Sequence, residues 1–85
     1  MPLQISAPPQ EIVPRIRTAV QAAIPGAQVD VVANGNHFEL RVVSPAFAGK
    51  RTLERQRMVL SSLRELMSGD HAPVHAIDKL ETVVP

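Results

Sequence analysis

The chain contains no cysteine. It therefore forms no disulfide and offers no thiolate for nucleophilic catalysis or for metal binding. Any metal must be held by His, Asp or Glu side chains, or by ligands that a partner supplies.

A strong excess of positive charge is also missing. Nine Lys and Arg residues against eight Asp and Glu residues give a formal net charge of +1. Dedicated nucleic-acid modules are usually far more basic. The two aromatic residues, Phe38 and Phe47, are expected in the core, so neither would be free to stack on bases.

Long apolar runs are absent as well. No stretch of about 18 apolar residues exists to cross a membrane, and Met1 to Gln10 lacks the charged start and apolar stretch of a signal peptide. We therefore expect a soluble, cytoplasmic protein without a membrane partner. With 85 residues, 45% of them hydrophobic, one modest core is possible, and a second domain is not.

For the first 26 residues we predict a loose leader followed by one helix. Residues 1–10 carry three prolines and no apolar periodicity, so we expect a flexible leader before a single domain over residues 11–85. A helix that starts near Glu11 to Val13 would place Pro14 in its first turn, where a missing N–H costs nothing. Pro25 and Gly26 should end this helix. Its apolar positions recur every three to four residues: Ile12, Ile16, Val20, Ala23 and Ile24.

A β-hairpin is predicted next. Apolar residues alternate over residues 28–33 and again over residues 38–42, which is typical of strands. Asn34-Gly35-Asn36 between them favours a tight type I′ turn. Residues 45–47 should then form one helical turn, and Gly49 should let the chain reverse.

The second half predicts a helix and a third strand. Thr52 is the expected N-cap of the longest helix, which Ser68-Gly69-Asp70 should stop. Residues 74–84 suit a strand. The order helix, hairpin, helix, strand predicts an α+β two-layer sandwich with both long helices on one face of a three-stranded sheet. The buried stripe of the second long helix should comprise Leu53, Val59, Leu60, Leu63, Leu66 and Met67.

Several motifs in this order resemble the BolA family. The family pattern is a strand ending in Ser, a Phe-x-Gly turn, a helix with two Arg residues two positions apart, and a last strand that opens with His-Ala. The resemblance covers about Glu11 to Val84 and implies an αββααβ fold similar to a class II KH domain. The matching residues are Asn36-His37-Phe38-Glu39-Leu40-Arg41-Val42-Val43-Ser44, then Phe47, Gly49, Arg55, Arg57, Val59 and Leu63, and finally Val74-His75-Ala76-Ile77.

The resemblance implies two functions. One is a non-enzymatic adaptor, without a small-molecule substrate, that pairs with a monothiol glutaredoxin in iron-sulfur trafficking or iron sensing, with or without a shared [2Fe–2S] cluster. The other is a DNA-binding transcriptional regulator of cell shape and stress response.

His75 is the first candidate ligand, because it matches the cluster-binding His of the family and neutral imidazole binds iron well. The alternative is a His that begins a strand and hydrogen-bonds a nearby carbonyl or carboxylate. One His cannot hold a cluster, since four ligands are normal. We therefore expect no cofactor in the isolated chain and a cluster only with a partner.

His37 is the second candidate. Several family members carry a Cys or His ligand in a longer loop between the first two strands, whereas this link is only Asn34-Gly35-Asn36. His37 follows it directly, and alternation points its side chain away from the core. An ordinary exposed His is the favoured interpretation here, and a ligand role is the alternative.

The residues on either side of Pro73 raise the question of two further sites. Pro73 argues against a helix that would align His71 with His75, although a zinc site of His37, His71, His75 and Asp70 is conceivable. Ser68, Asp70 and His71 are too close in sequence for a catalytic triad, and no oxyanion motif or paired carboxylates accompany them. We therefore predict no enzyme activity.

Lys50, Arg51, Arg55 and Arg57 form a local cluster that we call the basic patch. It can be a solvated turn and helix start, a phosphate-binding surface, or a surface that steers a glutaredoxin. KH modules clamp nucleic-acid backbone with Gly-x-x-Gly, whereas residues 46–51 contain a single Gly. Sequence-specific recognition of nucleic acid is thus weakly supported.

Overall fold

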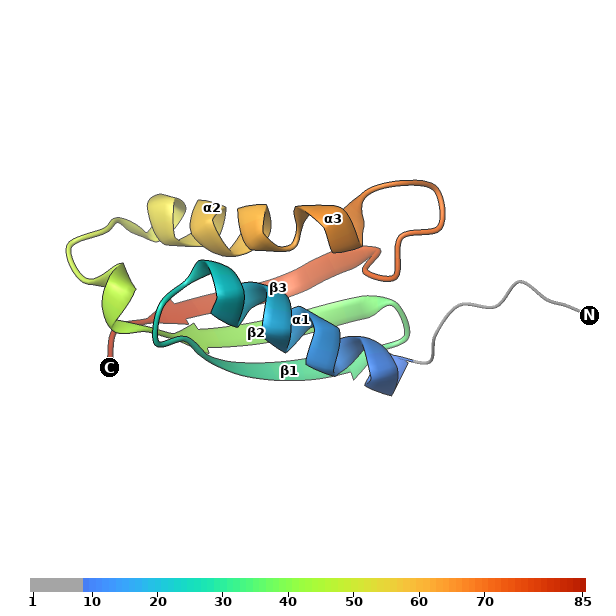
Figure 1. The fold of residues 1–85 in the computed structure, drawn as a ribbon, viewed down its shortest axis with the longest axis horizontal. Coiled ribbons are helices and arrows are strands. Elements are labelled where there is room, and N and C mark those ends of the chain that lie inside the picture. Colours follow the sequence, from blue (N-terminus) through green and yellow to red (C-terminus); the bar gives the residue numbers. More distant parts are fainter. Residues whose placement is uncertain (1–8) are drawn as a thin grey trace, which may run out of the picture.

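The computed structural model describes residues 9–85 (Figure 1). The order of its α-helices and strands is αββααβ, as predicted, with one 3-10 turn, η1, after the hairpin. The elements are α1 (Pro9–Ala23), β1 (Gln28–Asn34), β2 (His37–Val43), η1 (Pro45–Phe47), α2 (Thr52–Ser62), α3 (Arg64–Met67) and β3 (Ala76–Val83).

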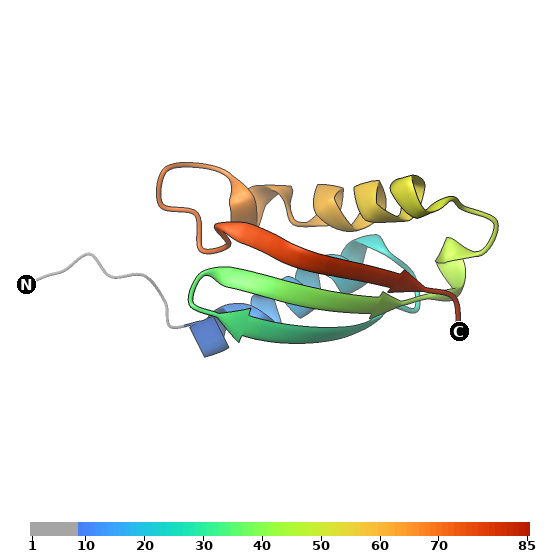
Figure 2. The same cartoon turned by 180° about the vertical axis from the view of Figure 1, so that it is seen from behind.

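The three strands form one mixed sheet in the order β1-β2-β3. β1 runs antiparallel to β2, and β3 runs parallel to β2. A parallel pair needs a long crossover, which the segment containing α2 and α3 supplies. The helices cover one face of the sheet, and the view from behind shows the other face uncovered (Figures 1 and 2). The predicted α+β two-layer sandwich is therefore confirmed.

Helix α1 begins earlier than predicted. It starts at Pro9, so Pro14 lies beyond the first turn, inside the helix. Pro14 has no N–H to donate to the carbonyl group of Gln10, and its ring is exposed. Of the predicted leader over residues 1–10, residues 1–8 lie outside the described residues, whereas Pro9 and Gln10 open α1. Among the described helices, none is long and apolar enough to cross a membrane.

The hairpin is confirmed, but its turn type is not. Asn34 pairs with His37, which leaves Gly35 and Asn36 as the two central residues. Gly35 has φ 65°, and within residues 9–85 only glycines have a positive φ. A type I′ turn needs positive φ at both central residues, so the type I′ prediction is wrong; the signs are those of a type II′ turn.

The helix predicted to begin at Thr52 differs at its start and in its middle. Arg51, not Thr52, occupies the N-cap, and its backbone N–H donates to the carboxylate of Glu54 at 2.8 Å. The helix is then interrupted at Leu63, so α1 is the longest helix described.

The interruption has a local cause. The hydroxyl of Ser62 donates to the carbonyl oxygen of Val59, which would otherwise accept from the N–H of Leu63. The Leu63 N–H instead reaches the nearer carbonyl of Leu60 at 3.2 Å. A short second helix, α3, follows.

The core lies between the helices and the sheet. Phe38 and Phe47 are buried, as predicted. Of the predicted stripe, only Val59 and Leu63 are fully buried; Leu66 and Met67 are half-buried, and Leu53 and Leu60 are 57% and 41% exposed. Full burial of one Val, Leu or Ile side chain contributes about 1.5–3 kcal/mol to the free energy of unfolding. The buried apolar residues are Ile12, Ile16, Val20, Ile24, Ala27, Val29, Phe38, Leu40, Val42, Phe47, Val59, Leu63 and Val74.

Candidate functional site

His75 lies immediately before β3 and is exposed. Its backbone N–H donates to the carbonyl oxygen of Asn36 at 2.9 Å, which fixes the backbone at this point to the hairpin turn. Within residues 9–85, no hydrogen bond involves its ring. The ring nitrogens are therefore available to a ligand from outside.

His37, the first residue of β2, lies beside His75. The centroids of the two rings are 5.4 Å apart, and the ring planes are tilted by 43°. The side chain of His37 is 43% exposed and lies away from the core, as the alternation predicted. The proximity was not predicted. It follows from the tight turn together with the parallel pairing of His37 with Ala76, the residue after His75.

Asp78 is the residue that the sequence analysis missed. Its carboxylate lies 2.9 Å (Oδ1) and 3.2 Å (Oδ2) from Nδ1 of His37. Because a carboxylate only accepts hydrogen bonds, the Nδ1–H of His37 is the donor. No sequence signal pointed to this contact, since it depends on the pairing of β2 with β3.

A hollow of about 420 Å³ opens beside His75. His71 shares this hollow with His75, but within the described part of the chain no group of three or more His, Asp or Glu side chains could hold a metal ion. The conceivable zinc site of His37, His71, His75 and Asp70 is therefore not formed. The hollow is lined by Asn36, Met67, Gly69, Asp70, His71, Ala72, Val74 and His75.

The basic patch divides into two kinds of residue. Lys50, Arg51 and Arg57 are exposed, whereas Arg55 is half-buried and its Nε–H donates to the carbonyl oxygen of Lys50 at 2.9 Å. Arg55 therefore ties the turn to the start of α2. This difference depends on the fold and is not visible in the amino-acid sequence.

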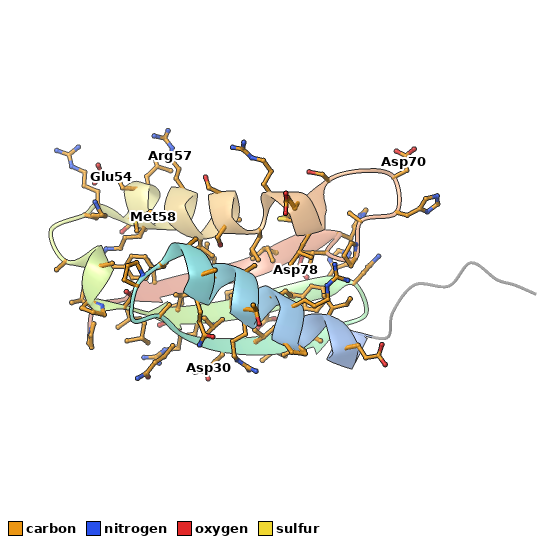
Figure 3. All side chains as sticks on the ribbon, in the orientation of Figure 1. Asp30, Glu54, Arg57, Met58, Asp70 and Asp78 are labelled. Atoms are coloured by element: carbon orange, nitrogen blue, oxygen red, sulfur yellow. The ribbon has the colours of Figure 1, made fainter. Side chains whose placement is uncertain are left out.

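The patch and the two histidines lie toward different ends of the molecule. In Figure 3, Arg57 projects from the early part of α2, and Asp70 and Asp78 lie toward the other end of the domain. Asp78 is hydrogen-bonded to His37, so the histidine pair lies toward the same end of the domain as Asp78. The structure thus brings His37 and His75 together and keeps the basic patch apart from them.

Comparison with known proteins identifies the family to which the chain belongs. The family model described as BolA-like protein matches residues 17–84. The chain belongs to the BolA family. Protein BOLA2 of Arabidopsis thaliana is 55% identical to this BolA-like protein over 38 residues, which are 45% of this chain and 41% of that relative. The match therefore spans less than half the length of that relative.

Solved structures agree with the BolA assignment. A BolA homologue from Coxiella burnetii is 31% identical, with a TM-score of 0.69, and the match covers 82% of this chain and 86% of that one. The BolA domain of SufE1 from Arabidopsis thaliana is 30% identical, with a TM-score of 0.63, and the match covers 84% and 88% of the two chains. The BolA-like fold implied by the sequence motifs is thereby confirmed.

Proposed function

We propose that this BolA-like protein is a non-enzymatic adaptor that docks a monothiol glutaredoxin and offers His75 to a [2Fe–2S] cluster shared by the two proteins. The observation that carries the proposal is the exposed ring of His75 beside the second imidazole, His37.

The donor atoms of the site suit a role in which this chain provides some of the cluster ligands and the partner provides the others. The chain has no thiol, and His37 and His75 place two imidazole rings side by side at this end of the domain. Iron-sulfur clusters normally have four protein ligands, and two His can replace two Cys on one iron. The remaining ligands must therefore come from outside this chain, the active-site thiolate of the partner among them. When bound, the cluster would supply iron and sulfide for transfer or sensing.

The residues around His75 favour its presentation to a partner. The hydrogen bond from the His75 backbone to Asn36 holds the start of β3 against the hairpin, and thus limits the positions that the ring can take. The adjacent hollow of about 420 Å³ offers room for a segment of the partner. Its walls come from the turn, from the end of α3 and from the loop before β3.

Anaerobic reconstitution with a monothiol glutaredoxin tests the proposal. We expect the isolated chain to be colourless, and the mixture to form a coloured heterodimer whose visible absorption changes in His75→Ala. His71→Ala is the matched control, because His71 is exposed and lines the same hollow. A heterodimer whose spectrum and stability are the same in wild type and His75→Ala would refute the ligand role.

A second function, DNA binding by a transcriptional regulator, has one observation in its favour. Lys50, Arg51 and Arg57 are exposed, and none of them forms an ion pair within residues 9–85. Such side chains are suited to phosphate contacts, which are sensitive to salt. This surface lies away from His75, so the two functions can be separated by mutation.

A further inference from the structure

We propose that Asp78 is a positioning residue that holds His37 as an Nδ1–H imidazole and so makes His37 and His75 a two-nitrogen donor pair for a transition-metal centre. This inference rests on the proposed function and deepens it, because it names a second donor and the group that prepares it. In several members of the family, a longer loop between the first two strands supplies a second ligand. In this chain that loop is short, and His37, which follows it, is the candidate for the second ligand.

The position of Asp78 arises from an irregularity in the sheet. Phe38 pairs with Ile77 and Glu39 pairs with Lys79, so Asp78 has no partner in β2. A bulge of this kind adds one residue to a strand and redirects the side chains beside it. In a regular strand, neighbouring side chains point to opposite faces, yet Asp78 and Lys79 are both exposed. The bulge therefore keeps Asp78 on the uncovered face, close to His37.

The hydrogen bond fixes which nitrogen of His37 is free. Both carboxylate oxygens of Asp78 lie within 3.2 Å of Nδ1 of His37. Nδ1 donates its hydrogen to this carboxylate, so in the neutral ring Nε2 keeps its lone pair. Metal-binding histidines commonly donate their other ring N–H to a carboxylate, which orients the ring and raises its basicity. His37 already has this arrangement.

His75 supplies the second nitrogen. Its ring is exposed and lies 5.4 Å from that of His37, centroid to centroid. Within residues 9–85, no further His, Asp or Glu completes a group of three possible ligands. The two histidines thus provide two donor atoms, and an external ligand or a partner must supply the others. Asp78 is not a ligand itself but acts by orienting His37.

Nitrogen NMR of the isolated, 15N-labelled chain tests the positioning directly, without a glutaredoxin. Long-range 1H–15N correlation at about pH 8 distinguishes protonated from unprotonated ring nitrogens. We expect His37 to carry its proton on Nδ1 in the wild type, and to shift toward Nε2–H in Asp78→Ala. Asp70→Ala is the matched control: it removes an exposed carboxylate that lines the hollow beside His75 and should leave His37 unchanged. A wild-type His37 that is mainly Nε2–H, or no change in Asp78→Ala, would overturn the proposal.

Calorimetric titration with Zn²⁺ alone tests the donor pair. We expect Asp78→Ala to weaken Zn²⁺ binding about ten-fold, in line with the loss of a carboxylate behind a His ligand, and Asp70→Ala to change it less than two-fold. His37→Gln and His75→Gln should each remove most of the binding. Absence of Zn²⁺ binding in the wild type, or equal affinity in wild type and Asp78→Ala, would contradict the inference. Neither readout involves a cluster or a glutaredoxin, so the inference and the proposed function can fail separately.

Discussion

The imidazole rings of His37 and His75 lie 5.4 Å apart, although one residue opens β2 and the other precedes β3. Two backbone features produce this proximity: the two-residue turn at Gly35 and Asn36, and the hydrogen bond from the His75 N–H to the Asn36 carbonyl. The pair is therefore a product of the fold and not of a local motif.

Buried and exposed leucines at the end of α2 can be distinguished by their effect on the free energy of unfolding. Leu63 is fully buried, whereas Leu60 is 41% exposed. We expect Leu63→Ala to lower the free energy of unfolding by about 2–5 kcal/mol, because it leaves a cavity as well as losing burial. Leu60→Ala should cost less than about 1 kcal/mol. Urea denaturation measures both, and equal losses would contradict the burial of Leu63 and the exposure of Leu60.

Ser44 is a buried polar residue with two hydrogen bonds. Its hydroxyl donates to the carbonyl of Pro25 at 2.7 Å and accepts from the N–H of Ala46 at 3.0 Å. Ser44→Ala leaves both backbone groups without this partner, so we expect a loss of about 1–3 kcal/mol in the free energy of unfolding. The exposed Ser61 provides the comparison, and Ser61→Ala should stay within about 0.5 kcal/mol. If the two changes had the same effect, the hydrogen bonds of Ser44 would not contribute to stability.

The basic patch separates into a binding part and a structural part. We expect Arg57→Ala to weaken binding to duplex DNA, if this surface contacts phosphates, and to reduce the slope of log K against log salt by about one. Arg55→Ala should instead lower the melting temperature, since it loses the hydrogen bond to the Lys50 carbonyl. Binding that is independent of salt, or unchanged in a Lys50, Arg51 and Arg57 triple alanine variant, would exclude a phosphate-binding surface.

Much of the fold could be predicted from apolar periodicity and turn residues. The hairpin, the turn at Pro45–Phe47 and the third strand were each found near their actual bounds. The break at Leu63 escaped prediction because it depends on the hydroxyl of Ser62 competing for a backbone carbonyl, a choice that the apolar pattern does not encode.

The candidate site could be predicted only in part. His75 is a candidate because it matches the family motif, in which the last strand opens with His-Ala. Its contact with His37 required the parallel pairing of β2 and β3, and the role of Asp78 required the bulge between them. Neither long-range pairing nor a bulge leaves a periodic signal in the sequence.

Pulsed electron paramagnetic resonance of the reduced cluster tests the central claim most directly. The chain would be labelled with 15N-histidine and assembled anaerobically with an unlabelled monothiol glutaredoxin. We expect a strong 15N coupling from directly bound imidazole, clearly reduced in His75→Ala and unchanged in His71→Ala. A cluster that shows no 15N coupling from this chain, or the same coupling after His75→Ala, would contradict the assignment of His75 as a ligand.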